Sequence, residues 1–376
     1  MKTSKYIYFI LLYSLFACTS SEIEPEIEID ADKDIIYLAD NGITIKASSR
    51  SKNGDTKEIN GITYTVVDLE TLNNLIETNA DLTKIVVSKI TDMSFLFQNQ
   101  VDFNQDLSTW DVSNVTTMDN MFINTSFDTD ISFWNVSNVT NMTAMFRDTP
   151  FNQNINSWNV SNITLMGELF RNTPFNSDLK NWNVSNVTNM GGMFRGCPFN
   201  QDISTWNVSN VTKMPEMFRD SNFNQNINSW DVGNVDNMGG LFRDSKFNQP
   251  LESWNMSNVL TMAAMFKNSS FNQNIEKWNV SKVEDMTSVF QDCISFNQDI
   301  SKWDIAQVTN IDGMIDRTAI SSANYDALLL EWSSLSLKEG LSFGAREVTY
   351  CNEKASRQKL ITNFNWVISD GGLNCN

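Results

Sequence analysis

The side chains that could do chemistry in this sequence are carboxylates, amides, hydroxyls and cysteines, because the sequence contains no histidine. Without histidine, Ser-His-Asp and Cys-His catalytic groups and histidine-containing zinc sites are excluded. An acidic run from Asp30 to Asp34 begins like a calcium loop, but Ile35 stands where that loop requires glycine. No acidic pair stands apart from the repeated pattern described below, as a histidine-free glycosidase would require. We therefore expect no metal, no cofactor and no enzymatic activity.

The charge of the chain excludes one large class of partner. The sequence has 27 Lys and Arg against 45 Asp and Glu, a net charge of −18 over 376 residues. Binding to nucleic acid depends mainly on basic side chains that neutralise phosphates, so we expect no nucleic-acid partner. Only 19% of the residues are charged, and the polar surface must therefore consist largely of Asn, Ser, Thr and Gln.

The amino terminus resembles a bacterial lipoprotein signal. Lys2 and Lys5 precede an apolar run of about 12 residues, shorter than the roughly 20 that span a bilayer, so the run is interpreted as a signal peptide. It ends in Leu-Phe-Ala-Cys at residues 15–18, which resembles the motif that is cut before a lipidated cysteine. By that resemblance Cys18 carries a lipid anchor; the alternative is an ordinary cleavage site nearby. Residues 22–34 are strongly acidic, which predicts an extended tether and weakly resembles an export signal of surface lipoproteins.

A 24-residue period governs the middle of the chain. Tryptophans stand at Trp110, Trp134, Trp158, Trp182, Trp206, Trp230, Trp254 and Trp278, and then at Trp303 after one extra residue, Ser295. Phenylalanines keep the same period from Phe103 to Phe296, and we number each repeat from this phenylalanine as position 1. A fixed period of this length is typical of repeat proteins, whose units bury their apolar faces only against one another.

Within each repeat, the apolar spacing predicts one strand and one helical turn. In the repeat that begins at Phe199, Trp206 and Val208 at positions 8 and 10 alternate as in a short strand. Apolar residues at positions 13, 16, 19 and 20 recur at helical spacing, and every methionine except Met1 falls on an apolar position, which predicts core. The expected fold class is therefore an α/β repeat solenoid, with one short parallel strand plus a short helix or helical turn per 24-residue repeat.

The flanks of the array are expected to be α+β caps that cover the open apolar ends of the stack. Strands are predicted at 43–47, 62–67, 341–345 and 366–369, and helices at 69–78 after Asp68, at 324–332, and at 352–364 with Asn352 as the N-cap. The predicted organisation is a signal peptide (1–17), an acidic tether (18–41), an N-terminal cap (42–80), the repeat solenoid (81–318) and a C-terminal cap (319–376).

The remaining cysteines are expected to fall into two classes. Cys197 and Cys293 lie four repeats apart, which at about 4.8 Å per repeat is roughly 19 Å and too far for a disulfide. We expect them to be buried thiols. Cys351 and Cys375 bracket the second predicted helix of the C-terminal cap, and in an exported protein we expect them to pair.

The repeat pattern resembles a known family. The residues Ile203, Trp206, Val208, Val211, Met214, Met217 and Phe218 fit the pattern I-xx-W-x-V-xx-V-xx-M-xx-MF, which resembles a leucine-rich repeat of the BspA type. Tryptophan at position 8 resembles the lipoprotein-associated branch of that family, and the resemblance covers about residues 80–318. It implies a bacterial surface adhesin or binding protein with a leucine-rich-repeat-like fold.

Stacking turns each outward repeat position into a column of side chains. Position 9 lies between two inward positions and is the candidate binding column, with solvated surface as the alternative: Asp111, Asn135, Asn159, Asn183, Asn207, Asp231, Asn255, Asn279 and Asp304. Position 21 is a candidate cationic strip for acidic glycans or a protein partner, with an exposed ladder of ion pairs as the alternative: Arg147, Arg171, Arg195, Arg219 and Arg243, continued by Lys267. Position 2, almost always asparagine, is expected to form a buried turn ladder.

These observations predict a binding protein of the bacterial cell surface. We expect lipid anchoring at the outer membrane and a solenoid surface that binds an extracellular protein or polymer, for adhesion. The alternative is a glycan-capturing surface lipoprotein of a nutrient-uptake system, which would need exposed aromatic side chains. Phe133 at position 7 is the outward aromatic residue found on the predicted sheet.

Overall fold

A computed structural model describes residues 34–375 of the chain. The predicted signal peptide, Cys18 and most of the acidic tether lie outside the described residues. Residues Ile35–Asn376 belong to one compact unit. Within residues 34–375, none of the helices combines the length and the apolarity that crossing a bilayer requires.

The N-terminal cap contains short strands and one helix. β1 (Ile36–Leu38) pairs antiparallel with β2 (Ile45–Ala47), and β3 (Thr56–Ile59) pairs antiparallel with β4 (Ile62–Val66), which in turn pairs parallel with β5 (Ile85–Val86). α1 (Leu69–Glu77) begins where the sequence predicts, because Asp68 Oδ1 accepts a 2.8 Å hydrogen bond from the Thr71 N–H. Leu72 and Ile76 on its inner face are buried in the core that continues into the repeats.

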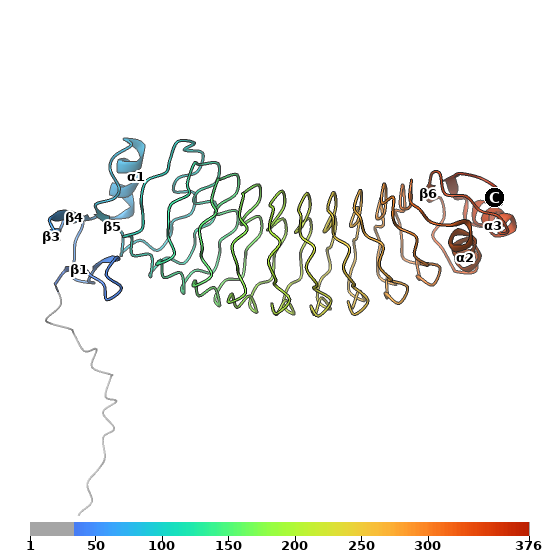
Figure 1. The fold of residues 1–376 in the computed structure, drawn as a ribbon, viewed down its shortest axis with the longest axis horizontal. Coiled ribbons are helices and arrows are strands. Elements are labelled where there is room, and N and C mark those ends of the chain that lie inside the picture. The colour runs from blue at the N-terminus through green and yellow to red at the C-terminus, as the bar shows by residue number, and fades with distance from the viewer. Residues whose placement is uncertain (1–33, 376) are drawn as a thin grey trace, which may run out of the picture. The chain divides into compact units, whose positions relative to one another are not determined.

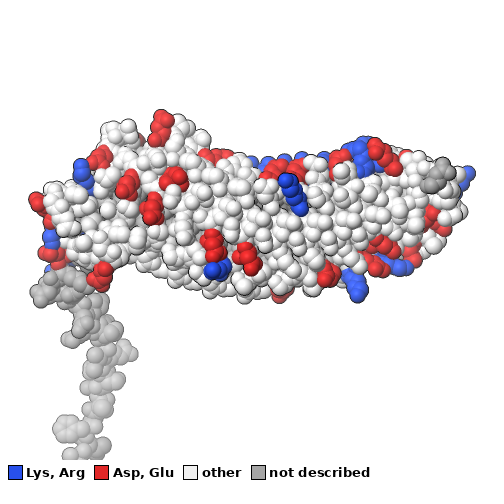
Figure 2. All heavy atoms as spheres, in the orientation of Figure 1, with Lys and Arg blue, Asp and Glu red and all other residues white. Residues whose placement is uncertain are grey.

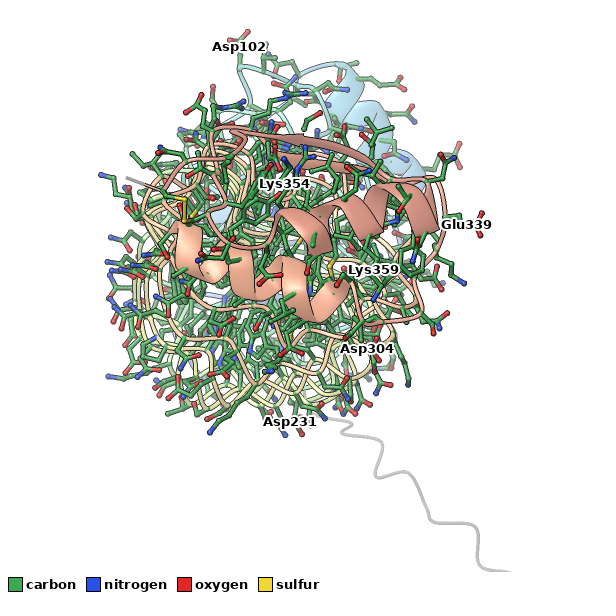
Figure 3. All side chains as sticks on the ribbon, turned by 90° about the vertical axis from the view of Figure 1, so that its right-hand side faces the viewer. Asp102, Asp231, Asp304, Glu339, Lys354 and Lys359 are labelled. Carbon is green, nitrogen blue, oxygen red and sulfur yellow. A yellow bond between two sulfur atoms is a disulfide. The ribbon has the colours of Figure 1, made fainter. Side chains whose placement is uncertain are left out.

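The C-terminal cap contains two helices and a two-stranded parallel sheet. Its elements are α2 (Ser322–Trp332), β6 (Ser342–Ala345), α3 (Lys354–Phe364) and β7 (Val367–Asp370). In Figure 3, which looks at this end of the unit, α2 and α3 lie across the end of the stack. The hydrogen bonds that join the repeats extend from the last repeat to β6, because the N–H groups of Ile315 and Arg317 donate to carbonyl oxygens of Gly344 and Arg346 at 3.1 and 2.8 Å.

The prediction that Asn352 caps α3 is wrong. The residue before the helix is Glu353, and its side chain makes no capping bond. Instead Asp326 reaches across from α2, and its carboxylate accepts hydrogen bonds from the N–H groups of Cys351, Asn352 and Glu353 at 3.0, 2.8 and 3.2 Å. A carboxylate from a neighbouring helix thus binds the backbone that leads into α3 and joins the two helices, although it does not reach the N–H groups of the first turn of α3.

Cys351 and Cys375 form a disulfide with a Cα–Cα distance of 4.8 Å, which is the pairing expected from the sequence. It closes a loop with a sequence separation of 24 residues that contains α3 and β7. On the chain-entropy argument, Cys375→Ser should lower the free energy of unfolding of the cap by about 3 kcal/mol. Urea titration followed by far-UV circular dichroism measures this loss. Reduction of the wild-type chain should reproduce it, and an unchanged unfolding midpoint in both experiments would contradict the prediction.

Between the caps the repeats stack one beside the next (Figure 1). Parallel bridges join position 15 of each repeat to position 15 of its neighbour, from Asp92–Thr117 through to Asp285–Asn310. The N–H groups at positions 16, 18, 20 and 22 donate to carbonyl oxygens of the following repeat, as at Met118, Asn120 and Phe122, with distances of 2.8 to 3.0 Å. The chain is therefore a repeat protein whose named helices and sheets, in residues 34–375, lie at the two ends of the array. At the N-terminal end they extend past the predicted cap bounds of 42–80, because β1 lies before them and β5 after them.

The strand and the helical turn predicted in each repeat are wrong. In the described repeats, positions 8–10 form no strand and positions 13–20 form no helix. The predicted helical turn is absent because the backbone is left-handed at positions 18 and 22, for example at Glu216 (φ 55°) and Asp220 (φ 55°). One left-handed residue interrupts an α-helix, so the segment forms successive turns that direct its N–H groups to the next repeat.

Side chains instead of a strand ladder join the repeats on the tryptophan side. Trp206 Nε1 donates a 3.2 Å hydrogen bond to the Leu179 carbonyl oxygen of the preceding repeat. Asn210 Nδ2 likewise donates to the Ser185 carbonyl oxygen at 2.7 Å. Equivalent bonds form at each tryptophan from Trp110 to Trp303. The indole thus serves as core filler and as a tie between repeats, which satisfies its polar N–H.

The core is a continuous stack of aromatic and methionine side chains. The ring of Phe218 lies 4.0 Å from that of Phe223 and 5.8 Å from that of Phe194 in the preceding repeat, between ring centroids. This arrangement recurs along the array, and the same buried cluster includes Leu72 of α1 and Trp366 beside β7. This cluster therefore joins both caps to the repeats. A second, smaller cluster lies under the N-terminal strands and contains Ile36, Ile45, Tyr64, Val66 and Val86.

Cys197 and Cys293 are free and buried, as expected from their spacing. Burial raises the pKa of the Cys197 thiol to about 11 and also raises that of Cys293. Because the folded state favours the neutral thiol, Cys197 contributes to the stability of the fold. This contribution is complete at pH values below the ordinary pKa of 9.0 and is lost as the pH rises towards 11. In a Cys18→Ala chain with its disulfide intact, we expect a thiol reagent at pH 8 to label neither cysteine before denaturation and both after it. Rapid labelling of the native chain would contradict this prediction.

Candidate functional site

The position 9 column is exposed, with one exception, but its side chains already have a structural role. Asn135 Oδ1 accepts a hydrogen bond from the Ser137 N–H at 3.2 Å, and Asp231 Oδ1 accepts one from the Gly233 N–H at 3.1 Å. The other members make the same bond two residues ahead: Asp111, Asn159, Asn183, Asn207, Asn255, Asn279 and Asp304. These are Asx turns, which shape the backbone at this corner of every repeat. One side-chain oxygen per residue is thereby occupied.

Asp111 does not belong to the exposed part of that column. Only 5% of its surface is accessible, because β2 of the N-terminal cap lies against this repeat through a parallel bridge between Ile45 and Trp110. Lys46 Nζ lies 3.5 Å from the Asp111 carboxylate and balances its charge. The sequence places Asp111 correctly within its own repeat but cannot show which residues of the cap cover it.

The candidate cationic strip is an ion-pair ladder in this structure. Glu168 at position 18 pairs with both Arg147 and Arg171, and Glu216 pairs with both Arg195 and Arg219. Arg243 pairs with Asp244 at 3.0 Å. All five guanidinium groups are only partly exposed and each has a carboxylate partner. Their charges are therefore compensated, which disfavours the acidic-ligand role and favours the alternative weighed for this column.

The position 2 asparagines form the expected ladder, but they are not buried. Asn200 Oδ1 accepts a 2.9 Å hydrogen bond from the N–H of Asn224 in the next repeat, and Asn224 does the same for Asn248. These side chains are half-exposed. They lie at the rim of the surface that carries the hollows described next.

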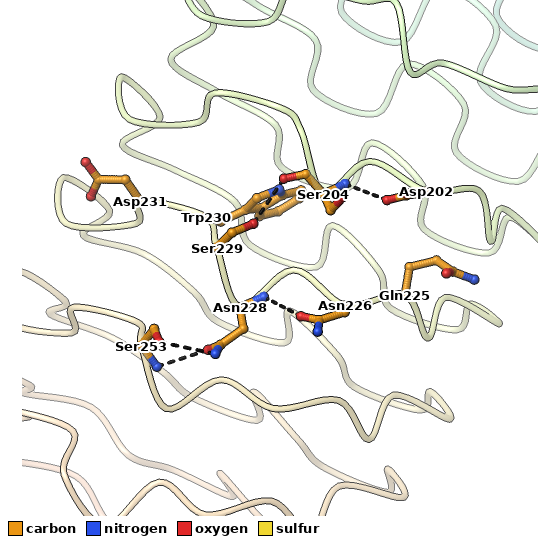
Figure 4. Close-up of a pocket in the computed structure, with 9 residues that line it drawn as sticks. All are labelled: Asp202, Ser204, Gln225, Asn226, Asn228, Ser229, Trp230, Asp231 and Ser253. Carbon is orange, nitrogen blue, oxygen red and sulfur yellow. Dashed lines mark hydrogen bonds between the residues drawn. The ribbon is translucent and has the colours of Figure 1, made fainter.

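One open hollow on the array surface has a volume of about 770 Å³ and spans three repeats. Figure 4 shows its lining, which is Asp202, Ser204, Gln225, Asn226, Asn228, Ser229, Trp230, Asp231 and Ser253. Smaller hollows of about 410 and 440 Å³ use the same repeat positions nearer each end. The shared positions are mainly 3, 4, 6 and 7, so a row of polar hollows follows from the repeat itself.

Hydrogen bonds between neighbouring repeats hold the walls of this hollow. Asn228 Nδ2 donates to Ser253 Oγ at 3.2 Å, and Asn228 Oδ1 accepts from the Ser253 N–H at 3.0 Å (Figure 4). Ser204 donates hydrogen bonds to Asp202 through its backbone and its side chain, which hold the pKa of that carboxyl below its usual value. Asp202 is therefore ionised at neutral pH and accepts hydrogen bonds. Trp230 contributes little to the surface because its ring is buried.

Sequence reasoning did not find these hollows. The sequence predicts that position 7, like position 9, faces outward. The hollows, however, are formed by side chains at positions 3, 4 and 6 of two or three repeats together with position 7. Aspartate or asparagine stands at position 4 in nearly every repeat, for example Asp130, Asp202 and Asn226, and this was the available signal. Among residues 34–375 no cluster of three or more acidic, cysteine or histidine side chains is placed to hold a metal ion.

Comparison with known proteins identifies a family. A family model described as "Mycoplasma protein of unknown function, DUF285" matches residues 68–176, 166–270 and 242–335. No curated protein sequence and no solved structure matches the chain. The three matches overlap and together run through the array and into both caps, over more than half of the sequence. On this basis the chain belongs to the DUF285 family.

Proposed function

We propose that this chain is a binding and adhesion protein of the bacterial cell surface, in which the repeat array binds an extracellular protein or polymer. The observation that carries the proposal is the row of polar hollows at the same positions of successive repeats. A stacked array presents many similar contacts along one direction, which suits a long or repetitive partner. The repeat family is compatible with such a role.

The anchoring part of the proposal rests on the amino-terminal sequence. Leu-Phe-Ala-Cys at residues 15–18 resembles a lipoprotein motif, and the BspA-type resemblance of the repeats implies the same location. We propose that a lipid on Cys18 holds the chain at the outer membrane and that the acidic residues up to Asp34 carry the array away from it. We propose no catalytic role, and release of products from a bound polymer would contradict this.

Proteinase K digestion of intact cells tests the location. If the wild-type chain is degraded while a periplasmic marker survives, the array faces outward, as proposed. Cys18→Ala removes the anchor and should release the chain from the membrane fraction. Protection of the wild-type chain until the cells are lysed would overturn the adhesin proposal.

Saturable binding tests the function. The full-length chain, immobilised through its C-terminal end, is titrated with extracellular matrix proteins and with polysaccharides. We expect saturable binding to at least one of these, and no saturable binding to double-stranded DNA. If nothing in either class binds, the proposed binding function is wrong.

A second candidate function, glycan capture for nutrient uptake, is favoured by a specific observation. Phe133 is 49% exposed and follows directly on Ser132, which lines the hollow of about 410 Å³. An exposed aromatic ring beside amide and hydroxyl groups is what a sugar ring needs for stacking and for hydrogen bonding.

A further inference from the structure

We propose that Phe133 and the hollow beside it form a binding site for one sugar unit of an uncharged polysaccharide. This inference rests on the proposed binding function and assigns that function a site and a ligand class. Phe133 provides the surface on which the sugar ring stacks, and the hollow provides hydrogen-bonding groups for the hydroxyls.

The hollow lies across three successive repeats. It has a volume of about 410 Å³ and is lined by Asp130, Ser132, Gln153, Asn154, Asn156, Ser157 and Asn181. Its walls are fixed by bonds between repeats, because Asn156 Oδ1 accepts from the Asn181 N–H at 3.1 Å and Ser157 Oγ donates to the Ser132 carbonyl oxygen at 3.2 Å. A site whose walls are held in this way loses little conformational entropy when a ligand binds.

The lining side chains keep hydrogen-bonding capacity for a ligand. Asp130 Oδ1 accepts from the Ser132 N–H at 2.9 Å, and Asn154 Oδ1 accepts from the Asn156 N–H at 3.1 Å. Gln153 Nε2 donates to the Asp128 carbonyl oxygen of the preceding repeat at 3.0 Å. In the described part of the chain these bonds use one end of each side chain. The other ends, two acceptor oxygens and one amide donor, match sugar hydroxyls, which both donate and accept.

Phe133 is placed at the edge of this hollow by the repeat. Position 7 is occupied by Phe133 in one repeat and by Ser157 and Asn181, both lining residues, in the next two. Phe133 also follows directly on Ser132, another lining residue, so the ring borders the hollow. All other residues of this column from Thr109 to Lys302 are polar or charged. An exposed ring is not needed for the stack, since the other repeats are built without one.

The charges at this site favour an uncharged ligand. The lining contains one carboxylate, Asp130, and no lysine or arginine. Lys180, in the third of the three repeats, has its Nζ 3.3 Å from the Asp178 carboxylate. An acidic glycan would therefore meet a negative group without a free cation to balance it, which lowers its affinity. The face of the unit seen in Figure 2 carries mainly uncharged side chains, with isolated acidic and basic ones.

Binding of defined oligosaccharides to the full-length chain tests the proposal. Uncharged hexasaccharides of glucose, mannose and galactose, and the acidic hexasaccharide of galacturonic acid, are titrated by isothermal calorimetry. Phe133→Ser installs the residue type found at position 7 in three other repeats, so we expect the fold to survive it. We expect this variant to lose about tenfold in affinity for the uncharged ligand that binds, and Phe133→Trp to retain it.

A matched control removes an exposed apolar side chain elsewhere. Leu260 at position 14 is 43% exposed, and six other repeats carry threonine there, so Leu260→Thr should leave sugar affinity unchanged. Binding of the acidic hexasaccharide with equal or higher affinity overturns the ligand class. Sugar binding that Phe133→Ser does not weaken overturns the site. Saturable binding of matrix proteins without any sugar binding overturns this inference but leaves the proposed binding function in place.

Discussion

Replacement of Trp206 by alanine is expected to lower the free energy of unfolding by about 4 kcal/mol. The indole is 4% exposed and its ring lies 6.4 Å from that of Phe194 in the preceding repeat. The substitution leaves a large cavity in the stack and removes the hydrogen bond from Nε1 to the Leu179 carbonyl oxygen. Both losses fall on the contact between two repeats, so the stack should weaken locally as well as globally.

Urea titration monitored by far-UV circular dichroism measures this effect, and hydrogen exchange of the neighbouring repeats shows where it falls. Trp206→Phe separates the two causes: it keeps most of the packing but removes the indole hydrogen bond, at a cost of about 0.5 to 1.5 kcal/mol, because the Leu179 carbonyl oxygen still accepts from the Trp182 N–H at 3.1 Å. Thr205→Ala, at the adjacent exposed position, is the control and should change stability by less than about 0.5 kcal/mol. Equal losses for Trp206→Ala and Thr205→Ala would show that the tryptophan is not an inter-repeat tie.

Gly344→Ala is expected to separate the C-terminal cap from the array, at a cost of about 3 kcal/mol or more. A Cβ atom on this residue of β6 would lie 2.3 Å from the backbone nitrogen of Gly313 and 2.4 Å from its Cα. Backbone atoms on both sides cannot give way without breaking the hydrogen bond between the Ile315 N–H and the Gly344 carbonyl oxygen. Two glycines facing each other therefore set how closely the cap approaches the last repeat.

Limited proteolysis and thermal melting measure this change. The variant should release a C-terminal fragment at protease concentrations that leave the wild-type chain intact. The control is Gly167→Ala inside the array, where the added Cβ lies 3.4 Å from the Gly191 carbonyl oxygen and where another repeat already carries Ala263 at the same position. If both variants melt like the wild-type chain, the cap does not depend on this close contact.

Much of the packing follows from the sequence. The 24-residue period and the apolar positions predict which side chains face inward, and every methionine other than Met1 is indeed buried. Outward position 9 is exposed in all repeats except the first, where the cap covers Asp111. Periodicity succeeds here because stacking copies one local environment many times, so a pattern too weak in one repeat becomes clear over nine.

The backbone path within a repeat could not be derived from the same pattern. Apolar residues at positions 13, 16, 19 and 20 fit a helical face, yet the left-handed residues at positions 18 and 22 turn the chain into successive bends. Asparagine, aspartate or glycine at position 22, as in Asn172, Gly196 and Asp220, was a signal for this conformation. Position 18 gave a weaker signal, because Glu168 and Glu216 adopt it too.

The candidate site was harder to predict than the core for a related reason. A column contains one position, whereas a hollow needs several positions from adjacent repeats and depends on how their side chains bond to one another. The pairing of Glu168 with two arginines shows the same difficulty, since the sequence leaves both a cationic strip and an ion-pair ladder open, while the structure shows the carboxylate that each arginine pairs with.

The hydrogen bonds between repeats at positions 16, 18, 20 and 22 have a direction, because these N–H groups donate to the following repeat. Without a partner beyond the last repeat, these N–H donors would be unpaired and the apolar end of the stack would be exposed. A second chain could then bind there edge to edge, and such growth has no natural limit. β6 ends that growth by supplying the Gly344 and Arg346 carbonyl oxygens. The caps thus close both ends of the array whatever the number of repeats between them. Gain or loss of one 24-residue repeat would change the length of the array by about 4.8 Å and leave both caps unchanged.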